Sequence, residues 1–283
     1  MLFQTEAIRP GLWRIWDVSH TAFYLVEGQN AAALIDSGVG VGSVRDVVMG
    51  LTDKPVSVWI THGHVDHAMG ASEFDEIHMD PADLPVFAAH SDMTMRQGYV
   101  AGAAMAGADP TAVAGVRATD FLPPPEAERL LPLSDGERVD LGGIHLRFYK
   151  LEGHTPGSMT VLLEEWRILI LGDACNAFTY LFDPSCPTVE QYRENLLRFR
   201  ERTDGSYDRL LFSHGTGEGD AAMIGNVIRV CEDVLAGHSD AVPFRGPFGD
   251  SAVIAKEMDF VRFCRVDGGE GNIVYNTGKV RNN

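Results

Sequence analysis

The sequence has few cysteines and no long apolar run. Four scattered cysteines in 283 residues, Cys175, Cys186, Cys231 and Cys264, exclude a disulfide framework and favour free thiols in a cytoplasmic protein. Residues 1–7 lack the basic segment and apolar run of a secretory signal. Because no apolar stretch is long enough to span a bilayer, no membrane helix is expected.

Basic residues are also scarce. The chain has 23 Lys and Arg against 40 Asp and Glu, a formal net charge of -17. Such a charge repels phosphate backbones and anionic lipid surfaces, so neither nucleic acid nor a membrane is an expected partner. With 45% hydrophobic residues the chain can bury a full core. We expect a small-molecule substrate and leave the oligomeric state open, a homodimer included.

The first half alternates strands and helices. Turn formers separate short apolar runs that predict antiparallel strands at 12–16, 21–26 and 31–36. Further strands are predicted at 56–60 and 76–79, and helices at 44–49 and 81–96. Residues 98–125 are rich in Ala, Gly and Pro and predict an inserted lid segment, with a plain helical hairpin as the alternative.

A second strand-rich half is predicted from Arg129 onward. Its expected strands are 130–133, 139–141, 144–151, 158–163, 167–171 and 210–212, and its expected helices are 189–202 and 221–235. The tail after 236 is predicted to be short and irregular, with a final hairpin formed by 260–265 and 272–275.

A glycine-rich segment, Ser37-Gly-Val-Gly-Val-Gly-Ser43, follows the predicted strand 31–36. It suggests a nucleotide-binding loop. However, its spacing is not G-x-G-x-x-G, and no acidic residue closes a second strand about twenty residues later. A tight turn between a strand and a helix is therefore favoured.

The chemistry is concentrated in residues 61–67, Thr-His-Gly-His-Val-Asp-His, after the apolar run 56–60. Three imidazoles and a carboxylate within six residues are hard to explain as core, because each needs a buried partner. A metal site explains them. His62 and His64 can reach one metal, and Asp66 and His67 another. Three later strand ends add ligands beside glycines: His154, Asp173 and His214.

These elements, together with Asp36-Ser37-Gly38, stand in an order that resembles the motif series of the metallo-β-lactamase superfamily over residues 12–236. The resemblance implies an α/β fold, a four-layer αββα sandwich of two mixed β-sheets flanked by helices. It implies one domain over 1–283 with a two-metal site. His62, His64 and His154 would hold the first metal, Asp66, His67 and His214 the second, and Asp173 would bridge them.

The same resemblance implies the chemistry. Two divalent metal ions would share a hydroxide that attacks a carbonyl, with zinc as the default pair and iron or manganese also suited to these ligands. Asp66 would orient the nucleophile or accept its proton, and Asp36 would steady the histidine loop. The ligand set is that of glyoxalase II-like thioesterases and lactonases, so we expect a hydrolase of a small ester, thioester or lactone.

Departures from the relatives leave alternatives open. True β-lactamases lack the bridging acid at Asp173, and lactonases carry a tyrosine soon after it, where this chain has Ala174-Cys-Asn176 and, further on, Tyr180. The alternatives are a phosphodiesterase or nuclease-type member, or a non-hydrolytic redox or sensor protein that binds metal. Cys175 is expected to be an ordinary buried thiol. The remaining histidines are expected to be ordinary structural residues: His20, His78, His90, His145 and His238.

Overall fold

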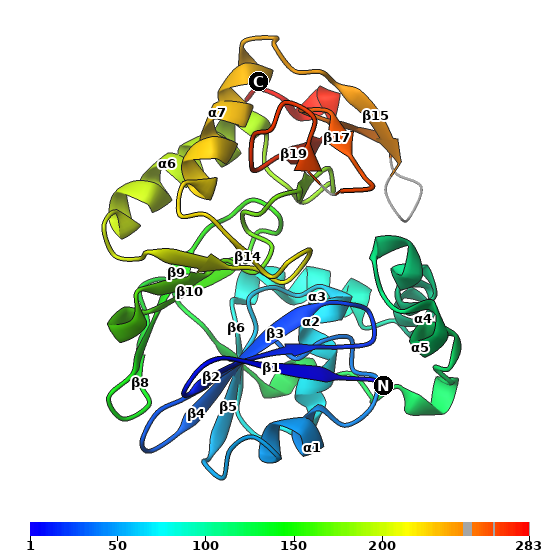
Figure 1. The fold of residues 1–283 in the computed structure, drawn as a ribbon, viewed down its shortest axis with the longest axis vertical. Coiled ribbons are helices and arrows are strands. Elements are labelled where there is room, and N and C mark those ends of the chain that lie inside the picture. Colours follow the sequence, from blue (N-terminus) through cyan, green and yellow to red (C-terminus); the bar gives the residue numbers. More distant parts are fainter. Residues whose placement is uncertain (246–250, 263, 283) are drawn as a thin grey trace. The chain divides into compact units, whose positions relative to one another are not determined.

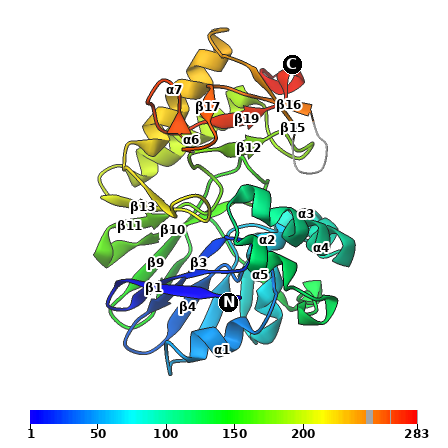
Figure 2. The same ribbon diagram turned by 45° about the vertical axis from the view of Figure 1, so that its right-hand side comes forward.

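The computed structural model describes residues 1–245, 251–262 and 264–282. The chain forms two compact units, Met1–Phe148 and Tyr149–Asn283. Each unit has its own helices and its own buried apolar core (Figures 1 and 2). Among the residues described, none of the helices combines the length and apolar character needed to cross a bilayer.

The first unit is built on a seven-stranded sheet in which the strands follow one another in chain order. Its strands are β1 (Gln4–Arg9), β2 (Leu12–Trp16), β3 (Ala22–Glu27), β4 (Ala32–Ile35), β5 (Val56–Trp59), β6 (Ile77–Met79) and β7 (Leu130–Pro132). Pairing is antiparallel from β1 to β4, as predicted for the early strands, and parallel from β4 to β7. β7 pairs with β6, so the strand predicted to open the second half belongs to the first.

Five helices accompany this sheet: α1 (Val44–Met49), α2 (Val65–Ala68), α3 (Leu84–His90), α4 (Met93–Gly102) and α5 (Pro110–Ala114) (Figure 1). Val44 and Val48 of α1 are buried with sheet residues such as Leu34 in one core. The single helix predicted at 81–96 is wrong. Asp92 accepts hydrogen bonds from the backbone N–H groups of Thr94 and Met95 at 2.9 and 3.1 Å, which starts a new helix there.

The glycine-rich segment is a tight turn that anchors residues 98–125. A Cβ on Gly40, whose φ is +71°, would lie 2.6 Å from the Met69 carbonyl oxygen, so this turn requires glycine. The fully buried Arg96 side chain donates to the carbonyl oxygens of Leu122, at 2.7 Å, and Val39, at 3.2 Å. Burial lowers the pKa of Arg96 to about 10. This single arginine ties both ends of the inserted segment to the turn.

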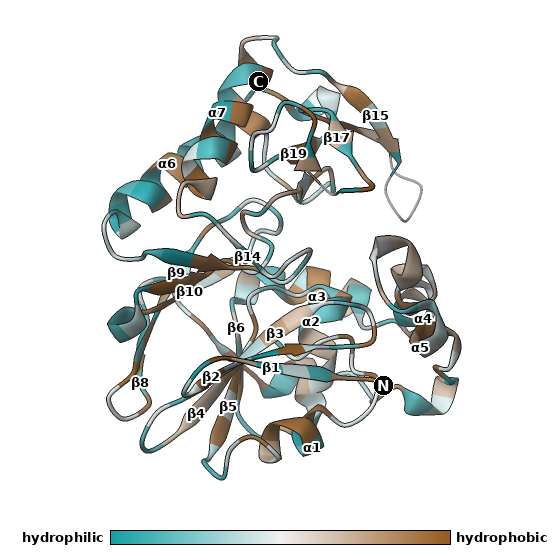
Figure 3. Cartoon of the chain, viewed as in Figure 1, coloured by the Kyte–Doolittle hydropathy of each residue, from teal (hydrophilic) through white to brown (hydrophobic). Residues whose placement is uncertain are grey.

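Strand β9 (His145–Lys150) contains the division between the units, and β8 (Arg138–Asp140) pairs with its first part. The second unit adds β10 (Met159–Leu163), β11 (Ile168–Ile170), β13 (Arg209–Leu211) and β14 (Glu218–Gly219). β11 is antiparallel to β10 and parallel to β13, so this sheet is mixed too. The predicted helices are α6 (Val189–Thr203) and α7 (Met223–Leu235), which pack on each other. Both carry hydrophilic and hydrophobic residues, as amphipathic helices do (Figure 3).

A four-stranded sheet in the second unit unites the tail with an earlier segment. Its order is β12 (Thr179–Leu181), β19 (Ile273–Tyr275), β16 (Ser251–Ile254) and β15 (Val242–Arg245). The predicted hairpin of 260–265 with 272–275 is wrong. β18 (Cys264–Arg265) pairs with β17 (Met258–Asp259), whereas β19 pairs with β12 and β16. The expected α/β class, with mixed sheets flanked by helices, is confirmed.

Candidate metal centre

The histidine loop, residues 61–67, follows β5 and leads into α2. Its backbone path depends on Gly63. A Cβ on Gly63 would lie 2.7 Å from the Phe87 backbone nitrogen, so no other residue fits without moving α3. The Gly63 N–H donates to Asp83 Oδ2 at 2.7 Å, and the Asp83 side chain is fully buried. The loop is therefore fastened to the start of α3.

Asp36 follows β4 and fastens the other side of the loop. β4 and β5 are parallel, so Asp36 and Thr61 emerge at the same edge of the sheet. Asp36 accepts from the Thr61 N–H at 2.7 Å, the Thr61 hydroxyl at 2.8 Å and His67 Nδ1 at 2.8 Å. It does so from a left-handed backbone, with φ of +63°. The expectation that Asp36 steadies the histidine loop is confirmed.

These contacts indicate which ring nitrogen of His62 and of His67 donates a hydrogen bond. His67 Nδ1 faces a carboxylate oxygen that only accepts, so Nδ1 carries the hydrogen and Nε2 the lone pair. The Thr61 hydroxyl gives its one hydrogen to Asp36, so it accepts from His62 Nδ1 at 3.1 Å. Both buried rings therefore present an Nε2 lone pair, the form in which imidazole binds a metal.

The ligand atoms of this unit converge in pairs. His62 Nε2 lies 3.1 Å from His64 Nδ1, and His67 Nε2 lies 3.4 Å from Asp66 Oδ2. Two ligands of one tetrahedral zinc stand roughly 3.3 Å apart, given metal–nitrogen bonds of about 2.0–2.1 Å. Both pairs are within about 0.2 Å of this spacing without any rearrangement.

Asp66 also has supports that the sequence did not reveal. Tyr99 Oη, from α4, donates to Asp66 Oδ2 at 2.6 Å, and Thr21 Oγ1 donates to the same oxygen at 3.1 Å. Thr21 N and Ser19 N in turn donate to Asp17 Oδ1 at 3.2 and 2.9 Å. Burial raises the pKa of Asp17, and the negative charge of Asp66 raises it further.

In the second unit, parallel pairing brings two more predicted ligands together. β11 and β13 run side by side, so Asp173 and His214, which follow them, emerge at one edge. Asp173 Oδ2 lies 3.0 Å from His214 Nε2 and 3.8 Å from His154 Nε2. His154 Nδ1 is 2.9 Å from the carbonyl oxygen of Tyr180. A carbonyl only accepts, so this ring too presents its Nε2 lone pair.

The donor chemistry of these residues fits divalent metal ions. Neutral imidazole nitrogens and carboxylate oxygens are ligands for zinc, iron or manganese. The described residues include groups of His and Asp whose ligand atoms could hold a metal ion. The histidine and aspartate clusters of this chain are thus able to bind metal.

Three histidines expected to be structural residues have partners. His20 stacks on Trp16 at 4.6 Å between ring centroids, and His78 on Trp59 at 3.8 Å. His90 Nδ1 accepts a hydrogen bond from the Val65 N–H at 3.2 Å. It therefore supports the histidine loop, and its isolated position in the sequence had no signal of this.

Cys175 is a buried thiol, as expected. It is fully buried, and burial raises its pKa to about 12. A thiol with such a pKa stays protonated at neutral pH and is a poor metal ligand.

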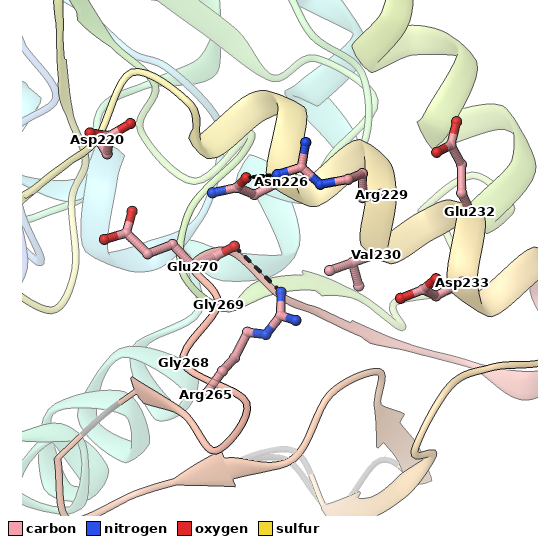
Figure 4. A pocket seen from close by; sticks show the side chains of 10 residues that line it. All are labelled: Asp220, Asn226, Arg229, Val230, Glu232, Asp233, Arg265, Gly268, Gly269 and Glu270. Atoms are coloured by element: carbon pink, nitrogen blue, oxygen red, sulfur yellow. Dashed lines mark hydrogen bonds between the residues drawn. The ribbon is translucent and has the colours of Figure 1, made fainter.

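A cleft of about 580 Å³ lies elsewhere in the second unit, between α7 and the turn after β18 (Figure 4). Three of its charged groups form ion pairs with residues outside the lining. Asp233 pairs with Lys256 at 2.6 Å and Glu232 with Arg193 at 3.1 Å, while Arg265 pairs with Asp267. The lining includes none of the predicted metal ligands, so this cleft is a poor candidate for the chemistry.

This chain is similar in sequence to known proteins. A curated relative, the acyl-coenzyme A thioesterase MBLAC2 of Gallus gallus, is 26% identical over 204 residues, which are 68% of this chain and 71% of the relative. An uncharacterised protein of Mycobacterium bovis is 29% identical over 130 residues, 45% of this chain and 53% of the relative. This chain thus matches only about half the length of the mycobacterial protein.

Solved structures share the fold. The metallo-β-lactamase from Pontibacter korlensis has a TM-score of 0.57 at 16% identity and covers 80% of this chain and 97% of its own. The sec-alkylsulfatase Pisa1 from Pseudomonas sp. has a TM-score of 0.60 at 16% identity. The match covers 83% of this chain and 42% of the sulfatase chain. The sequence profile of the metallo-β-lactamase superfamily matches residues 16–214, which include every predicted ligand. The chain therefore belongs to the metallo-β-lactamase superfamily and has its fold.

Proposed function

We propose that this protein is a metal-dependent hydrolase of a small ester, thioester or lactone. The observation that carries the proposal is the state of three buried imidazoles. His62, His67 and His154 each give the Nδ1 hydrogen to a defined acceptor and so keep Nε2 as a ligand. A histidine that merely filled the core would not need such an arrangement three times.

The proposed ligand assignment follows the motif order of the superfamily. His62, His64 and His154 would hold one divalent ion, and Asp66, His67 and His214 would hold a second. Asp173 would supply a carboxylate ligand to both. Zinc is the default for this set of nitrogen and oxygen ligands, while iron and manganese also suit it.

When bound, such ions polarise a carbonyl and lower the pKa of a coordinated water so that it can act as a nucleophile near neutral pH. In the proposed reaction water adds to the carbonyl carbon, and the bond from that carbon to the leaving oxygen or sulfur breaks. Asp66 takes the proton that the water loses and returns it to the departing alkoxide or thiolate. The hydroxyls of Tyr99 and Thr21 hold the Asp66 carboxylate in one orientation meanwhile.

A thioester is a natural substrate to test first. The relative whose matched region covers 68% of this chain is named as an acyl-coenzyme A thioesterase, and the ligand set matches that of thioesterase members. At 26% identity the substrate does not follow from this relative alone. The proposal therefore keeps esters and lactones within the reaction class.

We also propose that residues 98–125 shape access to the site as a lid, within a single domain that spans both units. Support comes from Tyr99, which belongs to this segment and contacts Asp66. Replacing residues 103–117 by a short linker keeps both Tyr99 and Arg96. Substrate preference across a panel would then change, and an unchanged preference would remove the lid role.

A cytoplasmic location is proposed from the free thiols, three of which are buried. Fractionation of the producing cells would test it, and recovery outside the cytoplasm would contradict it.

Activity is tested with protein loaded in turn with zinc, iron or manganese. The substrates are acyl-coenzyme A thioesters, p-nitrophenyl esters and acyl-homoserine lactones, with bis-p-nitrophenyl phosphate as the comparison. We expect turnover of at least one carbonyl class and its loss after chelation. Cleavage of the phosphodiester alone would favour the phosphodiesterase alternative. No turnover with any metal would leave a metal-binding protein without hydrolysis.

A further inference from the structure

The four-stranded sheet of the second unit has two apolar faces. One face, with Leu181, Ile273 and Tyr275, belongs to the core that contains α6 and α7. The opposite face has a separate cluster built on Phe178, Ile254 and Val274. Side chains alternate between the faces of a strand, so Phe178, Tyr180 and Phe182 all lie on this second face.

Aromatic rings dominate the second face. The Phe178 ring lies at its centre, with centroid distances of 5.4 Å to Tyr180, 5.6 Å to Phe244 and 5.9 Å to Phe260. Phe182 lies 5.2 Å from Tyr180. We call these five residues the aromatic face: Phe178, Tyr180, Phe182, Phe244 and Phe260.

The aromatic face is only partly covered by the protein. Phe178 is 7% exposed, whereas Phe260 is 54% exposed. Tyr180, Phe182 and Phe244 are intermediate. Exposed apolar side chains gathered in one place commonly mark a binding surface. Burial of this surface by a ligand is thus energetically favourable.

The aromatic face is joined to the predicted metal ligands of the same unit. His154 Nδ1 donates to the Tyr180 carbonyl oxygen at 2.9 Å. Asn176 Nδ2 donates to Asp173 Oδ1 at 3.5 Å, and the Phe178 N–H donates to Asn176 Oδ1 at 2.8 Å. Residues 173–181 therefore connect the Asp173 carboxylate with the rings of Phe178 and Tyr180. The charge of Asp173 also adds to the effect of burial in raising the pKa of Tyr180 to about 12.

We propose that the aromatic face is the subsite for the apolar acyl chain of the substrate. The inference rests on the proposed function, because it takes the carbonyl to react beside Asp173. Clustered aromatic rings favour a hydrocarbon chain over a polar or ionic group. The protein is therefore selective for esters or thioesters of hydrophobic acids, and the tail after residue 236 supplies part of that selectivity through Phe244 and Phe260.

A chain-length series tests the subsite. With p-nitrophenyl esters from acetate to decanoate, kcat/KM is expected to rise about fourfold for each buried methylene. Phe244→Ala and Phe260→Ala remove ring area, so each is expected to lower the decanoate-to-acetate ratio of kcat/KM about tenfold. Leu131→Ala is the matched control and should leave the ratio unchanged. Leu131 lies in the first unit, and its side chain is 45% exposed.

Binding of decanoate to metal-free protein separates this inference from the proposed function. Weaker decanoate binding in Phe244→Ala, measured by calorimetry, supports the subsite even if no ester is turned over. Equal hydrolysis of all chain lengths, with ratios unaffected by both variants, overturns the subsite while the hydrolase stands. If Phe260→Ala instead changes the sedimentation mass and leaves the chain-length profile intact, the aromatic face is a contact between copies and the proposal fails.

Discussion

The hydroxyl of Tyr99 donates a hydrogen bond of 2.6 Å to Asp66 Oδ2, and so connects the inserted segment to the histidine loop. Thr21 reaches the same oxygen from the turn before β3, at 3.1 Å. Two hydroxyls from distant parts of the first unit thereby orient one carboxylate. The side chain proposed to bind metal and carry a proton is held before any ligand arrives.

Replacing Tyr99 by Phe is expected to weaken metal binding about tenfold, because hydrogen bonds to a ligating carboxylate typically contribute 10–100-fold. Competition with a chromogenic chelator measures the affinity, and the visible spectrum of the cobalt-loaded protein reports the altered ligand field. Tyr275→Phe removes another tyrosine hydroxyl bond, to Ser239 at 3.1 Å, and serves as control. Equal affinities and spectra for the two variants would remove the positioning role of Tyr99.

The substitution Asp36→Asn tests the proton arrangement of His67. An amide has one accepting oxygen, so its NH2 group must face either Thr61 or His67 Nδ1, each of which donates to Asp36. The ring is expected to shift its hydrogen to Nε2 and lose metal affinity by about 10–100-fold. Metal content after dialysis and the nitrogen chemical shifts of His67 are the measurements. Asp140→Asn, at the exposed last residue of β8, is the control.

Removal of metal is expected to abolish hydrolysis, and His62→Ala or Asp173→Ala to reduce kcat/KM by about 100-fold or more. Mass spectrometry of the metals gives the ions bound per chain, and circular dichroism shows whether each variant is folded. His238→Ala, outside the predicted ligands, is the control. Full metal content and activity in either site variant would refute the ligand assignment.

Stability is expected to decrease at alkaline pH because of the buried thiols. Burial raises the pKa of Cys175 and of Cys186 to about 12, from the ordinary thiol value of 9.0. Above pH 9 the unfolded chain loses these protons while the folded chain keeps them. The free energy of unfolding therefore falls as pH rises from about 9 to 12, by up to about 1.4 kcal/mol per pH unit for each thiol.

Urea unfolding of the metal-free protein at several pH values measures this slope. Cys175→Ala is expected to make the fall of the unfolding free energy with pH less steep, because one of the buried thiols is removed. Cys264→Ala, at an exposed position, should retain the original slope. An identical slope in all three proteins would show that the buried thiols do not govern alkaline stability.

The sequence alone determined the features whose causes are local. The ligand types and their spacing within residues 61–67 are visible in the chain, and so are the strands that precede Asp173 and His214. The apolar periodicity of α6 and α7 was equally legible, because a helix repeats its buried face every few residues. Those local signals, kept in order, were enough to indicate the superfamily that the comparisons then established.

The tertiary structure alone decided which side chains support the ligands and where the apolar rings gather. Tyr99, Thr21 and His90 act across long sequence separations, and each is an ordinary polar residue in its own segment. The pairing of β12 with β19 joins residues more than ninety positions apart, which no local pattern encodes. Strand alternation could place Phe178, Tyr180 and Phe182 on one face, but only folding could bring Phe244 and Phe260 beside them.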